Sequence, residues 1–234
     1  MFHDRMVTFM CVSLKRRMVS NSDLGLLGLA LYCLSAMGFF LIGAGAIWLR
    51  SWGPAKFQTF TVPVVSMSPA LNPGDYVLGA MHIWQTPKLK RGDLVFFRFH
   101  IKAAHPVIWI KRVVGLPGDR VQMASGRLSI NGTLVPREQV GDDADGRPVE
   151  VRQYEETLPE GKSYRIIEHA EGRTSYDTMK AVDVPEGEVF LMGDNRNNSS
   201  DSRAFGTVPI TDVIGHPILI YWSQDPGRIG SVPR

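Results

Sequence analysis

The sequence predicts a mainly β protein, an antiparallel β-sheet domain with a smaller β-rich insertion, preceded by a single N-terminal transmembrane helix. Three observations lead to this fold class. Residues 24–49 carry no charged side chain. Beyond them, short apolar or alternating runs are separated by turn residues, which is the pattern of antiparallel strands. Asn131-Gly132 lies between two such runs and is the strongest short signal for a β-hairpin.

The uncharged stretch 24–49 is long enough to cross a bilayer. As a helix its 26 residues would extend about 39 Å, which exceeds the hydrocarbon core of roughly 30 Å. More basic residues precede it than closely follow it: Arg5, Lys15, Arg16 and Arg17 before, Arg50 and Lys56 after. The positive-inside rule then places the tail 1–23 in the cytoplasm and the domain 50–234 on the opposite side. The lipid bilayer is therefore an expected partner.

Two other interpretations of this stretch are weaker. Ala44-Gly45-Ala46 has the small-x-small form of a signal-peptide cleavage site, but the apolar core is longer than a cleaved signal peptide requires. A buried core helix would be shorter and would show a polar face, which the stretch lacks.

The rest of the chain is predicted to form short strands separated by turns. They are expected at 57–65, 75–81, 93–99, 106–114, 120–124, 127–130, 133–135, 149–154, 164–169, 188–192 and 213–222. Between 137 and 185 the composition becomes polar. We expect the segment 137–185 to be a peripheral insertion that carries little of the core.

Composition argues against several classes of function. The net charge of +3 is small and the basic residues are scattered, so we expect no nucleic-acid partner. Cys11 and Cys33 are the only cysteines, and no Cys/His pair has zinc spacing. The Asp- and Asn-rich stretch 193–203 lacks the spacing and the distal glutamate of a calcium loop. We therefore expect neither a metal nor a cofactor.

Ser66 is a candidate nucleophile, because it follows an apolar strand-like run and precedes the turn signal Asn72-Pro73-Gly74-Asp75. A turn serine that caps its own backbone is the alternative.

Lys111 is a candidate base, because it lies in the run 107–114, which otherwise suits a buried strand. Burial would lower its pKa and make it neutral near pH 7, as a general base for serine must be. An edge-strand lysine that extends to water is the alternative.

Four blocks in this order resemble the bacterial signal peptidase I (leader peptidase) family, a family of Ser/Lys proteases. The blocks are SMSPAL at 66–71, RGDLVFF at 91–97, KRVVGLPGD at 111–119 and GDNRNNSSDSR at 193–203. They extend over most of the chain beyond the apolar stretch. The resemblance implies that Ser66 is the nucleophile and that Lys111 is its general base.

The same resemblance implies supporting roles in the last block. The serine that matches Ser199 hydrogen-bonds the lysine in the family and orients its amine. Asp201 and Arg203 match a supporting ion pair, which at this spacing requires a turn, and Asp194 is expected to support the site from a tight turn after a strand. A solvated surface pair is the alternative for Asp201 and Arg203.

Substrate pockets are implied by residues near the nucleophile. Positions that line the family's shallow apolar pockets are matched by Phe60, Val62, Met67, Leu71 and Ile110, and Val64 is expected beside them. Ordinary core packing is the alternative for each. Such pockets accept small residues at the first and third positions before the cleaved bond, and the substrate would lie as an extended strand.

Two residues depart from the family pattern. Many Gram-negative relatives have a serine two residues before the nucleophile, whose hydroxyl helps to form the oxyanion hole, and here that residue is Val64. Others have glycine there and rely on backbone donors. Asn197 stands where relatives often have aspartate.

The resemblance implies a membrane-anchored serine endopeptidase on the outer face of a bacterial inner membrane. Its expected partners are the signal peptides of exported preproteins, with the protein-export translocon as a further one. Two alternatives stay open. One is a specialised paralogue that processes pilin or components of a secretion or conjugation system. The other is a non-catalytic scaffold that binds signal sequences.

Overall fold

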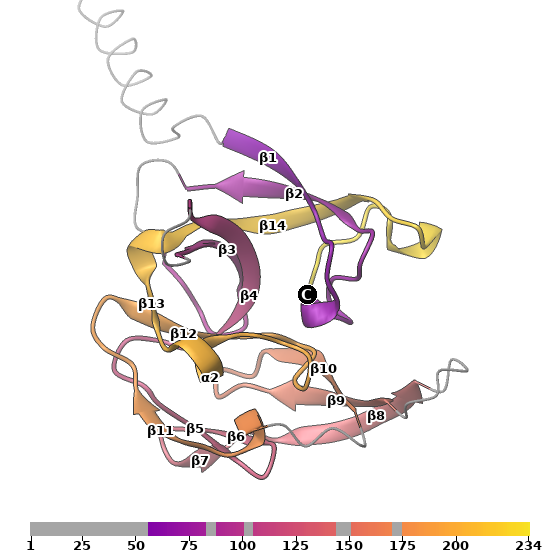
Figure 1. Ribbon diagram of the computed structural model, residues 1–234. Helices are drawn as coiled ribbons and strands as arrows, with labels where there is room; N and C mark the ends of the chain where they lie inside the picture. The colour runs from indigo at the N-terminus through magenta and orange to yellow at the C-terminus, as the bar shows by residue number, and fades with distance from the viewer. Residues whose placement is uncertain (1–55, 83–87, 101–104, 144–150, 170–174) are drawn as a thin grey trace, which may run out of the picture. The chain divides into compact units, whose positions relative to one another are not determined.

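The computed structural model describes residues 56–82, 88–100, 105–143, 151–169 and 175–234 (Figure 1). The predicted tail 1–23 and anchor 24–49 lie outside these ranges. Within them, no helix has the length and apolar character needed to cross a membrane. The predicted mainly β, antiparallel fold is confirmed for the described residues, which form fourteen strands and one short α-helix.

Seven antiparallel strands form the main sheet, in the order β1-β2-β14-β3-β4-β12-β13. Their bounds are β1 Lys56–Thr61, β2 Tyr76–Met81, β14 Val213–Trp222, β3 Leu94–Phe99, β4 Val107–Gly115, β12 Glu188–Met192 and β13 Val208–Pro209. Strand β4 pairs with β3 on one side and with β12 on the other. Its second half, from Lys111 to Gly115, is therefore fully buried.

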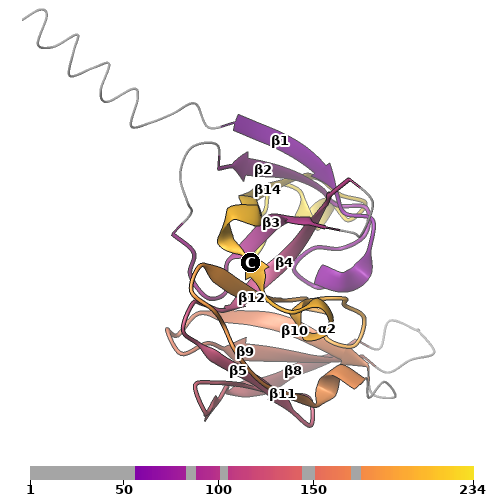
Figure 2. The same ribbon diagram turned by 60° about the vertical axis from the view of Figure 1, so that its left-hand side comes forward.

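Two smaller sheets lie on the far side of β12 from β1 and β2 (Figure 2). One has the order β11-β5-β6-β7 and the other β10-β9-β8. The bounds are β5 Arg120–Ala124, β6 Arg127–Ile130, β7 Thr133–Leu134, β11 Met179–Asp183, β8 Arg137–Asp143, β9 Val151–Thr157 and β10 Ser163–His169. The predicted hairpin is confirmed: Asn131 and Gly132 have φ of 53° and 79°, the two positive values that a type I′ turn requires.

The remaining elements are short. They are the α-helix α2 (Ser202–Phe205) and the 3-10 helices η1 (Val65–Met67), η2 (Ser175–Asp177), η3 (Ile210–Asp212) and η4 (Pro226–Arg228).

The strand predicted over 57–65 is wrong at its C-terminal end. Strand β1 ends at Thr61, and Ser66 lies in η1 rather than on a strand. Pro63 has no N–H and cannot continue the ladder, so the chain leaves the sheet there. The N–H of Val62 donates to the carbonyl of Asp75 (2.9 Å), which ties the start of this excursion to its end.

The expectation that segment 137–185 carries little of the core is also wrong. Leu158, Tyr164 and Ile166 are buried in one apolar cluster with Phe190 and Met192 of β12. The segment's average composition is polar because its strands alternate, so that apolar side chains cover one face while charged ones face water. The insertion therefore packs against the strand that leads into the stretch 193–203.

Candidate active site

Ser66 is held in a short turn beneath the end of β1. Val64 is extended (φ −131°, ψ 155°), and the N–H of Ser68 donates to the carbonyl of Val65 to close the 3-10 turn (3.0 Å). Met67 on the same turn is completely buried, which anchors the turn in the core. The carbonyl of Ser66 accepts from the N–H of Asn195 (3.1 Å), so the turn Val65–Met67, called the nucleophile turn after the predicted role of Ser66, is bonded to the stretch 193–203.

Lys111 extends from the central strand β4 to Ser66. Its Nζ lies 2.9 Å from Ser66 Oγ and 3.1 Å from the carbonyl oxygen of Ile110. The residue is only 4% exposed. Burial lowers the pKa of Lys111 from its ordinary 10.5 to about 8, although Asp201 and Asp194 oppose this shift. A substantial fraction of the amine is therefore neutral close to physiological pH.

Ser199 lies against the nucleophile turn but does not bond to Lys111 here. Its Oγ is buried and forms no hydrogen bond of good geometry among the described residues, although the hydroxyl is close enough to the Asp201 carboxylate to help lower the pKa of that group. A Cβ added to Gly193 would come 2.2 Å from Ser199 Oγ and 2.6 Å from the carbonyl oxygen of Ser66. This close approach requires glycine at position 193. The hydrogen bond between Ser199 and Lys111 that the resemblance implies is thus not formed in this structure.

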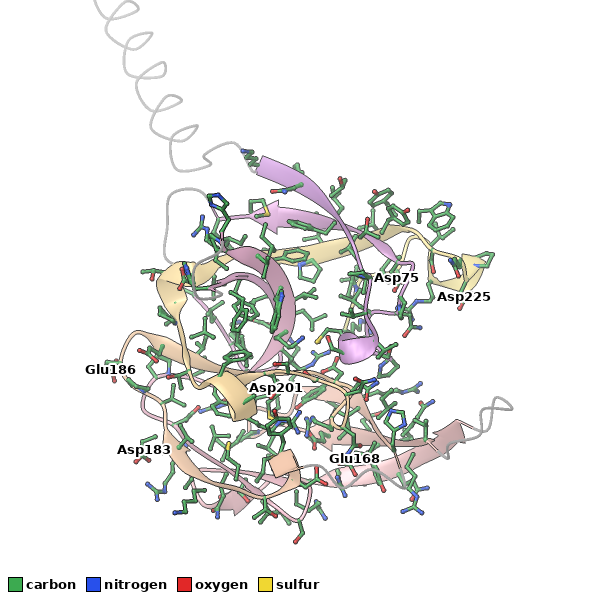
Figure 3. All side chains as sticks on the ribbon, in the orientation of Figure 1. Asp75, Glu168, Asp183, Glu186, Asp201 and Asp225 are labelled. Carbon is green, nitrogen blue, oxygen red and sulfur yellow. The ribbon has the colours of Figure 1, made fainter. Side chains whose placement is uncertain are left out.

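Asp201 and Arg203 form an ion pair across the turn that their spacing demands. Arg203 donates to both carboxylate oxygens of Asp201 (2.8 Å each), and both side chains are fully buried. Asp201 lies at the start of α2 (Figure 3). Asp201 also accepts from the N–H of Gly193 (3.0 Å) and caps α2. Burial raises the pKa of Asp201, but its bonds to Arg203 and Gly193 outweigh this and lower it on balance.

Asp194 pairs with Arg112, a partner that the sequence did not single out. Arg112 donates two 2.7 Å hydrogen bonds to its carboxylate and one to the carbonyl of Gly92 (2.8 Å). Burial alone would lower the pKa of Arg112, but Asp194 raises it on balance, so the guanidinium stays charged. The sequence signal for this pair is the presence of two adjacent cations, Lys111 and Arg112, in a run that otherwise suits a buried strand. Neighbouring side chains face opposite sides of a strand, so a buried Arg112 needs a partner of its own.

Glu156 and Arg196 form a third buried ion pair that sequence analysis missed. Arg196 Nη1 donates to Glu156 Oε1 (2.9 Å) and Nη2 to Oε2 (2.5 Å). No sequence signal marks Glu156, because it lies in a stretch with several other charged residues. With Asp194, Asp201 and Glu156 all bound to arginines, the carboxylates near this site are already paired.

An open cleft of about 430 Å³ has Ser66 and Lys111 among its lining residues. It is lined by five of the six predicted substrate residues, which are Phe60, Val62, Val64, Met67 and Ile110. Leu71 is not among the lining residues: its side chain is completely buried in the core with Val62 and Met67. Trp109, Asn198 and Ser200 also line the cleft and were not predicted.

A family model described as "Signal peptidase, peptidase S26" matches residues 34–222. The chain belongs to this signal peptidase family. It is 32% identical to a signal peptidase I of Pseudomonas aeruginosa, over 76% of this chain and 69% of the relative. It is 31% identical to one of Rickettsia typhi, over 71% and 72% respectively. The resemblance inferred from the four blocks is confirmed, and the chain is a hydrolase of the serine endopeptidase class that removes signal peptides.

A solved structure of a signal peptidase I from Enterococcus faecalis is also similar. It is 28% identical and covers 56% of this chain and 97% of its own, with a TM-score of 0.33.

Removing one partner of the buried pair Arg112–Asp194 should destabilise the protein strongly. Replacing Asp194 with Asn leaves the Arg112 charge buried without its partner, and we expect the free energy of unfolding to fall by about 3–5 kcal/mol. The control is Asp183→Asn, whose partner Arg120 is exposed like Asp183 itself (Figure 3), and which should leave stability almost unchanged. Urea unfolding measures both. Equal losses in the two variants would contradict the role of the pair.

Proposed function

We propose that this signal peptidase cleaves preproteins with Ser66 as nucleophile and Lys111 as general base. The observation that carries the proposal is the 2.9 Å contact between Lys111 Nζ and Ser66 Oγ, at a lysine whose pKa burial lowers to about 8. A neutral amine at this distance can accept the serine proton. A non-catalytic scaffold would have no use for such a contact, because a buried lysine is costly.

The proposed reaction has two halves. As Lys111 takes the proton from Ser66 Oγ, the oxygen attacks the carbonyl of the residue before the scissile bond and forms a tetrahedral oxyanion. The ammonium then gives its proton to the leaving amine, and an acyl-enzyme remains. A water molecule, activated by the same amine, hydrolyses this ester and releases Ser66. The backbone N–H of Ser66 is the proposed donor to the oxyanion.

Ser199 is the proposed third group of the site. Its hydroxyl is buried between the nucleophile turn and the Asp201 carboxylate but forms no hydrogen bond of good geometry, and buried hydroxyls normally form one. We propose that Ser199 bonds the Lys111 amine when substrate fills the cleft. Asp201 supports it by fixing the N–H of Gly193 and the first turn of α2.

The cleft walls are consistent with an extended, mostly apolar substrate. Phe60 stacks on Phe96 at 4.1 Å between ring centroids, and these rings form an apolar floor beside Ile110. We propose that the signal peptide lies along the chain before Ser66, with small side chains facing these walls.

We further propose that the domain works at the outer face of a bacterial inner membrane, with residues 24–49 as anchor and 1–23 as cytoplasmic tail. The charge distribution around 24–49 supports this topology. Three exposed aromatic residues, Tyr76, Tyr221 and Trp222, provide a surface typical of a membrane interface. The ring centroids of Tyr76 and Trp222 are 5.0 Å apart. The translocon remains a proposed partner in substrate delivery.

Substitution of either reactive group should abolish cleavage without unfolding the protein. We expect Ser66→Ala, Lys111→Ala and Lys111→Arg each to retain less than about 1% of wild-type kcat/KM, since nucleophile and base act as a unit and arginine keeps its proton. Cleavage of a preprotein by the full chain in detergent is the measurement. The control Lys162→Ala removes an exposed lysine paired with Asp93 and should stay active. Substantial activity in any of the first three variants would rule out the dyad.

The rate should depend on pH through Lys111. Because only the neutral amine accepts a proton, kcat/KM should rise between pH 6 and 9 with a midpoint near 8. The same lowered pKa means that the unfolded state binds more protons between about pH 8 and 10.5, so this group's contribution to stability increases with pH there. Lys111→Met should lack this slope in unfolding experiments. A flat rate profile, with chemistry shown to be limiting, would contradict the role of Lys111.

Val64 tests the oxyanion hole. Its side chain is 56% exposed and lines the cleft, so a hydroxyl there would face the reacting carbonyl rather than the core. We expect Val64→Ser and the nearly isosteric Val64→Thr to raise kcat, by up to about 100-fold if a donor is missing. Val64→Ala is the control and should not. A gain in all three would indicate steric relief instead, and a loss in all three would make Val64 a packing residue.

A further inference from the structure

The insertion bonds directly to the stretch that contacts Ser66. At the end of β10, the N–H of Ile167 donates to the carbonyl of Asp194 (2.9 Å) and its carbonyl accepts from the N–H of Arg196 (3.0 Å). Asn195, between these two residues, donates its N–H to the carbonyl of Ser66. The backbone of the insertion is thus one residue away from the nucleophile turn.

Glu156 on β9 is the centre of a polar cluster buried beneath this junction. Its carboxylate accepts two hydrogen bonds from Arg196 and a third from the Tyr164 hydroxyl (2.9 Å), and Arg196 Nη2 also lies 3.0 Å from that hydroxyl. The three residues are at most 4% exposed. A carboxylate that is buried and triply bonded is fixed in place, and so are the groups that bond it.

The cluster reaches both reactive groups through separate contacts. Toward the base, the ring of Tyr164 lies 4.3 Å beneath the guanidinium of Arg112, the residue next to Lys111 on β4. Toward the nucleophile, Arg196 directly follows Asn195, and its carbonyl accepts from Arg203 Nη2 (2.7 Å). None of these cluster residues lines the substrate cleft.

We infer that Glu156 is a positioning residue for catalysis: it fixes Arg196 and Tyr164, and through them the insertion sets the separation between Lys111 and Ser66. This inference rests on the proposed dyad. It assigns the insertion a role in chemistry rather than in substrate binding. A displacement of about 1 Å at reacting groups can cost up to about 100-fold in rate, so the effect should be measurable.

Glu156→Gln in the full chain in detergent tests the inference. It keeps the shape of the side chain but removes the charge and replaces one acceptor oxygen with a donor. We expect kcat per folded molecule to fall about 10- to 100-fold while KM changes less than about twofold. We also expect the acidic limb of the pH profile to move to higher pH. The reason is that a shift of the stretch 193–203 away from Lys111 would let water reach the amine. Burial is the main cause of the lowered pKa of Lys111, so this pKa would rise.

Few charged groups face Lys111 and could shift the acidic limb of the pH profile without a change in its burial. Asp201 and Asp194 raise its pKa and Arg203 lowers it, and Glu156→Gln removes none of them. The matched control is Glu168→Gln, the same substitution on β10 of the same sheet, where Arg137 is the partner. It should leave kcat and the pH midpoint unchanged.

Two results would overturn the inference. One is that folded Glu156→Gln has the kcat of the wild type. The other is that its loss of activity equals the unfolded fraction measured by circular dichroism, while the midpoint of the pH profile does not move. If Glu156→Gln does not fold, Tyr164→Phe decides, because it removes only the hydroxyl between Glu156 and Arg196. Unchanged kcat there also overturns the inference. Ser66→Ala and Lys111→Ala, assayed in parallel, separate this outcome from failure of the dyad, since activity in either variant would mean that the dyad itself is wrong.

Discussion

The burial of one lysine amine beside one serine hydroxyl is the constraint on which the rest of the structure depends. Lys111 must lose most of its contact with water for its pKa to fall to about 8, and it must do so without a carboxylate at ion-pair distance among the described residues. A central strand provides this environment, because β4 is covered along both edges and from Lys111 onward is buried. The same burial that lowers the pKa of the lysine makes its position costly for the fold.

Charged groups around the lysine are paired with one another instead of with it. Arg112–Asp194, Arg196–Glu156 and Arg203–Asp201 each place a guanidinium against a carboxylate with almost no exposed side-chain surface. Buried pairs of this kind add little net stability, but they demand one geometry, because a displaced partner leaves an uncompensated charge. They therefore hold the stretch 193–203 rigidly against the nucleophile turn while leaving the amine of Lys111 available to the serine.

Much of this could be predicted from sequence where the signal is local. The hairpin at Asn131-Gly132, the buried run around Lys111 and the turn that brings Asp201 to Arg203 all follow from short patterns. What the sequence could not predict depends on contacts between residues that are far apart in the chain. Leu71 lies close in the chain to residues of the cleft but is buried in the core, and Glu156 acquires its importance only because the fold brings it to Arg196, 40 residues later. A polar average over 137–185 also concealed a buried face, since alternation in strands places opposite chemistry on successive residues.

The most direct test of this account is the ionisation of Lys111 itself. The full chain in detergent micelles, with lysine labelled with ¹³C at Cε, would be titrated by NMR, and the resonance assigned by its loss in Lys111→Arg. The account predicts a midpoint at about 8, well below the 10.5 of an ordinary lysine, because burial disfavours the ammonium. A midpoint near the ordinary value would show that the amine is hydrated and charged at neutral pH, and Lys111 could not then be the base for Ser66.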